Sequence, residues 1–280
     1  MPLVMTPRST NAPVYSDDCY LLIDGIALDV PVIAYTLDDH PRIEPLFRGT
    51  RHAEIIEASP WLIKPSVEGR LLTTREDWQQ HGMVLRSLVP MPVLAEHLRS
   101  LISVRLPSQQ LAYCRFHDPA WANRILGSMN SGEFLAWSGP ITEWLVFIDG
   151  AWHAYENNIP GVPRSSGDEG WFQLREEQLA RWQAEEYERF LDRAAGHFGY
   201  MKEHSDYPQQ RAKVGELIQQ AQGYGFGMEY QILHYLELAS RFQVELAHPG
   251  WVAHFSNRAQ DADTRLRQAE ERLFGLSEGV

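Results

Sequence analysis

The strongest constraint on the fold is a change in hydrophobic pattern about 160 residues into the 280-residue chain. Before this point, apolar residues come in short runs that end at turn residues, as Cys19–Ile23 ends at Asp24-Gly25. After it, apolar residues recur every three or four positions, as an amphipathic helix requires. The sequence therefore predicts an α+β protein. An N-terminal α/β lobe with a mixed sheet (residues 1–160) precedes an all-helical C-terminal lobe (residues 171–280).

The N-terminal lobe is expected to alternate short strands with short helices. Residues 1–17 contain three prolines and indicate a loose leader. Strands are predicted at 19–23, 61–63, 83–85, 111–116, 134–137, 144–148 and 152–155. Helices are predicted at 31–37, from Pro92 to Ile102, and after Asp118. Because helices alternate with strands in this order, we expect parallel as well as antiparallel pairs.

The segment from Pro160 to Gly170 is the best candidate for a linker. It contains two prolines, three glycines and two serines, with no apolar period. Helices are then predicted at 171–198, 206–223, 230–242 and 258–274. The residues between the second and third of these, Gly223-Tyr-Gly-Phe-Gly227, are expected to form a helix–helix turn and not a dinucleotide loop.

Charge and cysteine content exclude several classes of partner. With 25 Lys and Arg against 37 Asp and Glu, the formal charge is −12, so neither nucleic acid nor an anionic membrane is expected to bind. The two cysteines, Cys19 and Cys114, form no CxxC pair, which favours a reducing compartment. No apolar stretch approaches the roughly 18 residues of a membrane span, and no signal peptide is evident. We expect a cytoplasmic protein.

Few residues suggest catalysis or ligand binding. The chain has no GxSxG elbow, no HExxH helix and no phosphate loop, and its 11 histidines are dispersed. Neither a metal nor another cofactor is therefore expected. His117-Asp118 is the one catalytic-looking pair. Asp118 before Pro119 is better explained as the N-cap of a helix, since Asp caps helices and Pro favours their first turn.

Several short motifs occur in an order that resembles the domain-of-unknown-function family 4123. The matching segments are Tyr20–Gly25 ("Y-x-L-x-D-G"), Leu46–Thr50 ("L-F-x-G-T"), Ala58–Ile63 ("x-x-P-x-L-V"), Glu96–Ile102 ("x-H-L-R-x-L-L"), Arg115–Pro119 ("F-R-x-x-D-P", with the phenylalanine displaced) and the strand containing Trp144. The family core would then cover about residues 19–149. Its structural motif residues would be Asp24, Gly25, Phe47, Gly49, Arg115, Asp118 and Pro119.

This resemblance implies a non-enzymatic adaptor chaperone of bacterial type VI secretion. Such a protein binds a cognate toxic effector and helps to load it onto the VgrG spike. Effector binding would depend on aromatic or aliphatic anchors, for which the helical lobe offers Trp171, Trp182 and Trp251. Core burial is the competing interpretation of each tryptophan.

Two other functions stay open from the sequence. One is a hydrolase that uses His117 and Asp118, which would need an open pocket containing both side chains. The other is an immunity protein that blocks a toxin, for which an acidic surface would suit a nuclease.

Overall fold

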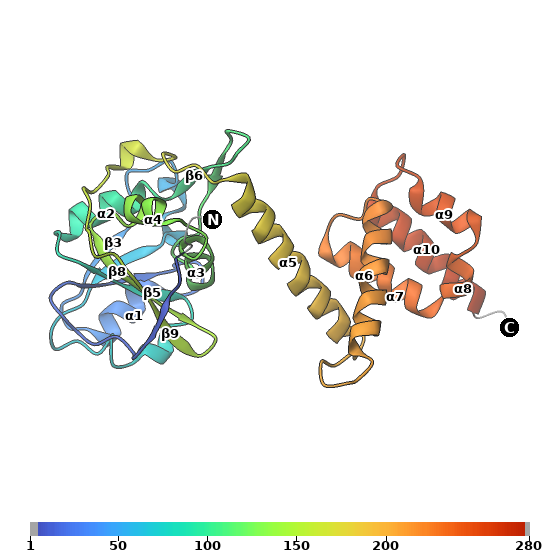
Figure 1. Cartoon of the computed structure of the whole chain (residues 1–280), viewed down its shortest axis with the longest axis horizontal. Coiled ribbons are helices and arrows are strands. Elements are labelled where there is room, and N and C mark those ends of the chain that lie inside the picture. Colours follow the sequence, from blue (N-terminus) through green and yellow to red (C-terminus); the bar gives the residue numbers. More distant parts are fainter. Residues whose placement is uncertain (1–4, 278–280) are drawn as a thin grey trace. The chain divides into compact units, whose positions relative to one another are not determined.

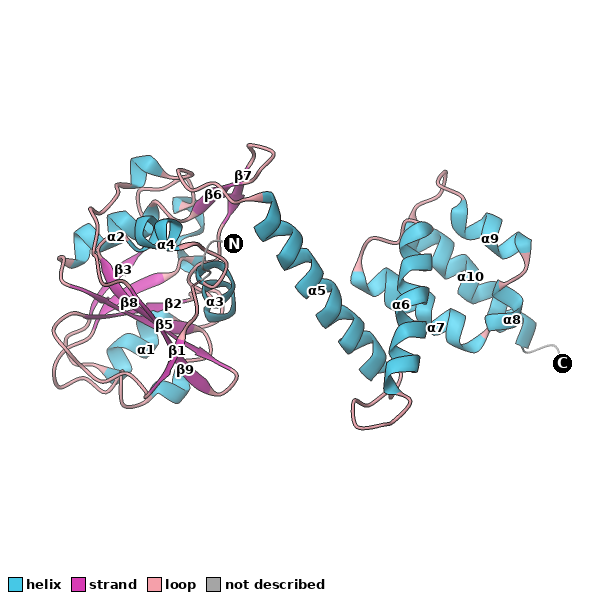
Figure 2. Ribbon diagram, viewed as in Figure 1, coloured by secondary structure: helices cyan, strands magenta, loops and turns pink. Residues whose placement is uncertain are grey.

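The structure, a computed structural model, describes residues 5–277 and divides the chain into two compact units. The first, Met1–Leu179, is called the sheet unit here, and the second, Ala180–Val280, the helical unit. The α+β class is confirmed, since a sheet precedes a run of helices (Figure 1, Figure 2). The helix α5 (Glu176–His197) contains the point of division.

A seven-stranded sheet forms the centre of the sheet unit (Figure 2). Its strand order is β1-β9-β8-β5-β2-β4-β3, with bounds Arg8–Thr10 (β1), Cys19–Ile23 (β2), Arg42–Pro45 (β3), Trp61–Lys64 (β4), Gly82–Ser87 (β5), Ile141–Ile148 (β8) and Ala151–Glu156 (β9). Every neighbouring pair is antiparallel, so the expected mixed sheet is wrong. The physical reason lies after the first helix, where the chain turns back through β3 and β4 and makes no parallel crossover.

Tight turns and short helices complete this unit. Asp149 and Gly150, both with left-handed backbones (φ 52° and 79°), close the predicted β8–β9 hairpin. The remaining elements are α1 (Val30–Leu37), α2 (Met91–Arg99), α3 (Pro119–Leu126), α4 (Ser131–Ser138), the small hairpin β6 (Ser103–Arg105) and β7 (Leu111–Tyr113), and the 3-10 segments Ala53–Ala58, Arg75–Asp77 and Ser166–Asp168.

The helices cover both faces of the sheet. Val30 and Ala34 of α1 pack in one core cluster with Leu21 and other strand residues. On the opposite face, the Trp144 indole donates to Ser138 Oγ at the end of α4, and the Tyr155 hydroxyl donates to Asn123 of α3. Side chains alternate across a strand, so β2 and β8 each contribute to both cores.

Three sequence predictions for this unit need correction. Residues 134–137 lie in α4 and not in a strand, because Asn130 and Glu133 form a capping box that starts a helix there. Part of the expected leader, Arg8–Thr10, pairs as an edge strand with β9. The predicted strand 111–116 ends at Tyr113.

The segment expected to be a linker packs against the sheet unit. Gly161 N donates to Gly139 O at 2.7 Å, Arg164 N to the His97 ring at 3.2 Å, and Ser166 N to the Glu96 carboxylate at 3.1 Å. The division between the units falls later, after Leu179. The composition of the 160–170 segment predicts a flexible linker. Its backbone N–H groups instead donate hydrogen bonds to Gly139, His97 and Glu96 of the sheet unit.

The helical unit is built around an aromatic cluster. Its helices after α5 are α6 (Tyr207–Gly223), α7 (Glu229–Arg241), α8 (Gln243–Leu246), α9 (Pro249–Ser256) and α10 (Ala262–Ser277). The rings of Tyr224, Phe226, Tyr235 and Phe255 lie 5.3 to 6.3 Å apart between centroids. The expected helix–helix turn between α6 and α7 is confirmed. Gly225 (φ 81°) adopts the left-handed conformation that ends a helix.

Among residues 5–277, none of the helices combines the length and the apolar character needed to cross a membrane.

Candidate functional site

Three of the motif residues meet in the sheet unit although they are far apart in the sequence. Arg115 Nη2 lies 3.1 Å from Asp24 Oδ2 and 3.2 Å from Asp118 Oδ2. Asp24 follows β2, whereas Arg115 and Asp118 lie between β7 and α3. The guanidinium therefore ties the first turn of the family core to the start of α3. Because the Asp24 side chain is only 5% exposed, its charge needs such a partner.

Asp118 caps α3, as the sequence predicts. Its Oδ1 accepts hydrogen bonds from Ala120 N at 2.9 Å and Trp121 N at 3.1 Å, and Pro119 occupies the first turn. With Oδ1 bonded to helix amides and Oδ2 to Arg115, the carboxylate is committed to structure.

His117 is buried beside this ion pair. Its side chain is 1% exposed, and Nε2 lies 3.9 Å from Asp24 Oδ2. Neither ring nitrogen has a hydrogen-bond partner within residues 5–277. Burial lowers the pKa of the imidazole, and the nearby Asp24 charge opposes that shift only in part. The ring is therefore neutral near pH 7 and has no access to a substrate.

The glycine and phenylalanine motifs serve packing as well. A Cβ on Gly25 would lie 2.1 Å from Ser59 O, so only glycine fits this close approach. Phe47 is buried, and its backbone N donates to Ser59 Oγ at 3.0 Å. Gly49 has a left-handed backbone (φ 74°) that lets the loop turn.

The three candidate tryptophan anchors lie in separate places. Trp171, half-buried in the sheet unit, has the Arg164 guanidinium 3.7 Å above its ring. Trp182 of α5 is buried. Trp251 of α9 is half-buried and stacks against Phe255 of the helical core. Trp171 thus belongs to the sheet unit, whereas Trp182 and Trp251 belong to the helical unit.

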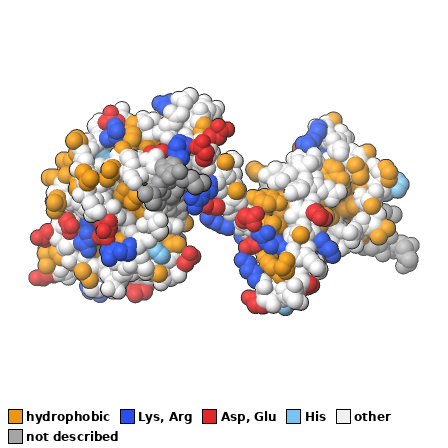
Figure 3. Space-filling model, viewed as in Figure 1, with side chains coloured by type: hydrophobic (Ala, Val, Ile, Leu, Met, Phe, Trp, Pro, Cys, Tyr) orange, Lys and Arg blue, Asp and Glu red, His pale blue; other side chains and the backbone are white. Residues whose placement is uncertain are grey.

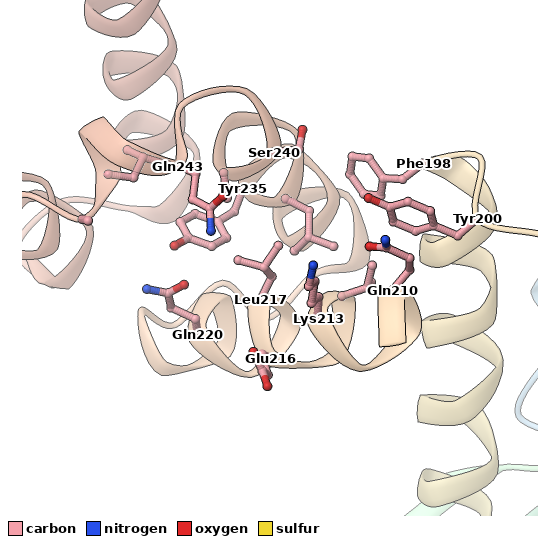
Figure 4. A pocket seen from close by; sticks show the side chains of 15 residues that line it. Phe198, Tyr200, Gln210, Lys213, Glu216, Leu217, Gln220, Tyr235, Ser240 and Gln243 are labelled. Carbon is pink, nitrogen blue, oxygen red and sulfur yellow. The ribbon is translucent and has the colours of Figure 1, made fainter. Parts of the chain in front are cut away.

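A groove in the helical unit is the more suitable place for a partner (Figure 4). It has a volume of about 600 Å³ and runs between α6 on one side and α7 with α8 on the other. Apolar and aromatic side chains form much of it: Phe198, Tyr200, Val214, Leu217, Tyr235, Leu236, Ala239, Leu246 and Ala247. Its polar lining residues are Gln210, Lys213, Glu216, Gln220, Ser240 and Gln243.

One end of the groove is closed by the loop that follows α5. Figure 4 shows Phe198 and Tyr200 together at that end. Asp192 holds this loop, because its carboxylate accepts hydrogen bonds from Lys202 Nζ at 2.7 Å, the Tyr207 hydroxyl at 3.0 Å and Arg211 Nε at 2.7 Å. These bonds set the pKa of Asp192 well below its ordinary range. These contacts connect α5 to residues that follow Phe198 and Tyr200 in the chain.

The groove carries little net charge. Of the residues that the structure describes, Lys213 and Glu216 are the only acidic or basic ones in the lining, and their formal charges are opposite. In a chain of net charge −12, this surface therefore neither attracts cations strongly nor repels an apolar segment. Hydrophobic side chains appear between acidic and basic ones on the visible face of the helical unit (Figure 3).

Sequence reasoning placed Val214 and Leu217 on an inner helix face but did not identify the groove. The lining combines one face of α6 with residues of α7, α8 and the 198–200 loop. No local spacing predicts which of these elements meet. Among residues 5–277, no group of three or more His, Cys, Asp or Glu side chains could hold a metal ion.

Comparison with protein families identifies part of the chain. Residues 19–134 match the family described as Domain of unknown function (DUF4123), so this segment belongs to that family, as the order of the motifs predicts. The matched segment contains Asp24, Arg115 and Asp118 but not the groove. Comparison with curated proteins and with solved structures gives no match.

Proposed function

We propose that this protein is a non-enzymatic adaptor chaperone of bacterial type VI secretion, acting in the cytoplasm. In this proposal it binds a cognate effector and helps to load it onto the VgrG spike. The family membership of residues 19–134 and the order of their motifs support the proposal.

The state of the only catalytic-looking pair supports a function without catalysis. His117 is buried and neutral, and Asp118 is bonded to helix amides and to Arg115. A general acid or base must come within hydrogen-bond reach of a substrate, and His117 is covered by the protein. The burial of His117 therefore argues against the hydrolase interpretation, which requires its side chain in an open pocket.

The observation that carries the proposal is the groove of the helical unit, which has little net charge and a lining that combines apolar and polar side chains. A volume of about 600 Å³ accommodates several side chains of a partner. Helix-in-groove recognition places the apolar face of one helix between two others, with polar residues at the rim. The Gln210, Gln220 and Gln243 side chains suit such a rim. We therefore assign the groove to an apolar helix face of the effector.

Co-expression with a candidate toxin effector tests the adaptor function. The toxin should stay soluble, co-purify with this protein and be secreted, and it should aggregate or remain inside the cell when this protein is deleted. A toxin that is soluble and exported normally without this protein would refute the adaptor function.

A matched pair of variants tests the groove. Leu217→Ser removes an apolar groove wall, whereas Val244→Ser removes an exposed apolar side chain that does not line the groove. Losing a buried leucine contact should weaken effector binding by about tenfold or more. The Val244→Ser protein should bind as the wild type does, and equal losses would place the interface elsewhere.

Protection assays distinguish the immunity alternative. If this protein alone protected a sibling cell from the toxin and left export unchanged, the immunity function would replace the adaptor function.

A further inference from the structure

A second hollow lies in the sheet unit beside the Asp24-Gly25 turn. It has a volume of about 440 Å³ and is lined by Gly25, Ile26, Ala27, Leu28, Asp29, Val30, Pro31, Glu57 and Trp61. These residues come from the β2–α1 connection, the first turn of α1, the 3-10 segment Ala53–Ala58 and the start of β4. The hollow is called the turn pocket below.

The turn pocket has a single sign of charge. Among the described residues, Asp29 and Glu57 are the only acidic side chains in its lining, and no Lys, Arg or His belongs to it. Within residues 5–277, neither carboxylate forms an ion pair, whereas Glu44 is paired with two arginines and Asp24 with Arg115. Asp29 Oδ1 also caps α1, since it accepts a hydrogen bond from Val32 N at 3.3 Å, but in the described part of the chain no cation neutralises either carboxylate. A pocket with two acidic side chains and no basic one favours a cation.

Trp61 gives the turn pocket an aromatic wall in a fixed position. The residue belongs to β4, where it pairs with Ile23 and Pro45 in the sheet. The Gly25 backbone lies against its ring, since a Cβ on Gly25 would be 3.0 Å from Trp61 Cδ1 and Nε1. Tryptophan is the strongest aromatic partner for a guanidinium or ammonium group. The carboxylates and the indole thus favour the same kind of ligand.

Apolar side chains around the turn pocket point to a polypeptide and not to a free cation. Ile26 in the lining is 67% exposed. Val32 and Tyr35, which follow on α1 at a spacing of three, are also exposed. Residues three apart share a helix face, so Val32 and Tyr35 form an apolar strip on α1. This strip begins next to Val30 and Pro31 of the turn pocket. A small cation would leave such a strip uncovered.

We propose that the turn pocket receives a Lys or Arg side chain of a protein partner, from a segment in which apolar residues flank the basic one. The aliphatic stem packs on Ile26 and Pro31, the cationic head meets Glu57, Asp29 and the Trp61 ring, and the flanking residues cover the α1 strip. This surface is separate from the groove and does not depend on the effector function. In an adaptor it would serve a second partner.

Nuclear magnetic resonance of the full-length protein with two tripeptides tests the proposal. The probes are N-acetyl-Leu-Arg-Leu-amide and its Leu-Gln-Leu counterpart, which has the same apolar flanks without the charge. The Trp61 indole N–H resonance, assigned by its loss in Trp61→Phe, is the readout. The arginine peptide should shift this resonance in a saturable way and bind about fivefold or more tighter than the glutamine peptide. Added salt should reduce that difference.

Paired variants locate the charge effect. Glu57→Gln should weaken arginine-peptide binding by about fivefold, because the substitution keeps the side-chain size and removes one carboxylate. Glu54→Gln, in the same 3-10 segment but outside the lining, should leave binding unchanged. Both positions are exposed, so neither variant should disturb folding.

Three results would overturn the proposal: equal shifts by the two peptides, no shift of the Trp61 resonance at saturating arginine peptide, or methylguanidinium alone binding as tightly as the peptide. The last would indicate a small-cation site. The titration involves neither toxin solubility nor export, so its failure would leave the adaptor function standing, and failure of the adaptor function would leave this result unchanged.

Discussion

The two units differ in what they bury. The sheet unit encloses several ionisable side chains, namely Asp24, Asp38, His97, Arg99 and His117. In the described part of the helical unit, Arg265 is the only charged residue that is fully buried, and its guanidinium donates to Tyr224 O and Phe255 O beside the Phe226 ring. Buried ionisable side chains are therefore more frequent in the core of the sheet unit, whereas aromatic and aliphatic side chains dominate the core of the helical unit. A core that contains buried polar contacts tolerates substitution poorly, because each replaced group leaves a partner unsatisfied. Helices that pack through apolar side chains can leave a groove open between them.

His97 illustrates the polar kind of packing. Its Nε2 donates to Trp137 O at 3.0 Å, and its Nδ1 accepts from Arg164 N at 3.2 Å, so both nitrogens are used by a neutral ring. Burial lowers the pKa of His97 to about 4. One side chain thus joins α2, α4 and the 160–170 segment.

The largest effect should come from Gly25→Ala. The new methyl group would meet Ser59 O at 2.1 Å, and both backbones are held in the sheet unit. Such overpacking should lower the free energy of unfolding by more than about 3 kcal/mol. Urea unfolding measures this when followed by thiol labelling, because both cysteines are buried in the sheet unit and become reactive only when it opens. A variant with unchanged stability would show that the turn can move.

Mild acid should destabilise the sheet unit next most strongly. The folded-state pKa of His97 is about 4, below its ordinary 6.5, so the unfolded state binds more protons between these values. The stabilisation is complete above pH 6.5 and is lost as the pH falls toward 4, by about 3 kcal/mol for this residue. His117, whose pKa is also lowered by burial, acts in the same direction.

Urea midpoints measured with a dithiodipyridine thiol reagent, which reacts in acid, test this pH dependence. His97→Gln should flatten it. In the described residues, the helical unit buries no histidine, so the predicted loss belongs to the sheet unit. A thiol-labelling midpoint that stayed constant as the pH fell from 6.5 to 4 would contradict it.

A smaller effect should follow Asp118→Ala. The substitution removes the cap of α3 and one partner of Arg115, and should cost about 1 kcal/mol. Asp118→Asn keeps the capping oxygen and should cost less, which thermal unfolding can compare. Equal losses in the two variants would assign the effect to the ion pair.

The smallest effect should be a gain, in Gly223→Ala. This position lies in the last turn of α6, and a Cβ there would have no atom within 4 Å. Replacing a helical glycine with alanine should raise stability by about 0.5 kcal/mol. Calorimetry of Gly223→Ala and Gly25→Ala measures the stability change caused by the same substitution in the helical unit and in the sheet unit. A lower melting temperature for Gly223→Ala would contradict the free space that the structure shows around this position.

Elements with strong local chemistry were predictable. The Asp149-Gly150 hairpin, the Asp118-Pro119 helix start and the apolar run Cys19–Ile23 each depend on neighbours in the chain. The strand prediction for Phe134–Trp137 is wrong because a four-residue apolar run fits a strand or a helix equally well. The Asn130–Glu133 capping box before it decides for the helix.

The sequence by itself determined the α+β class, the order of the family motifs and the lack of a familiar catalytic motif, since all three depend on residue type and short spacing. Only the tertiary structure decided that the strands pair antiparallel, that Arg115 joins Asp24 to Asp118, and where the groove and the turn pocket lie. The physical reason is distance along the chain. Arg115 lies 91 residues from Asp24, and contacts of such separation form only when the whole core packs.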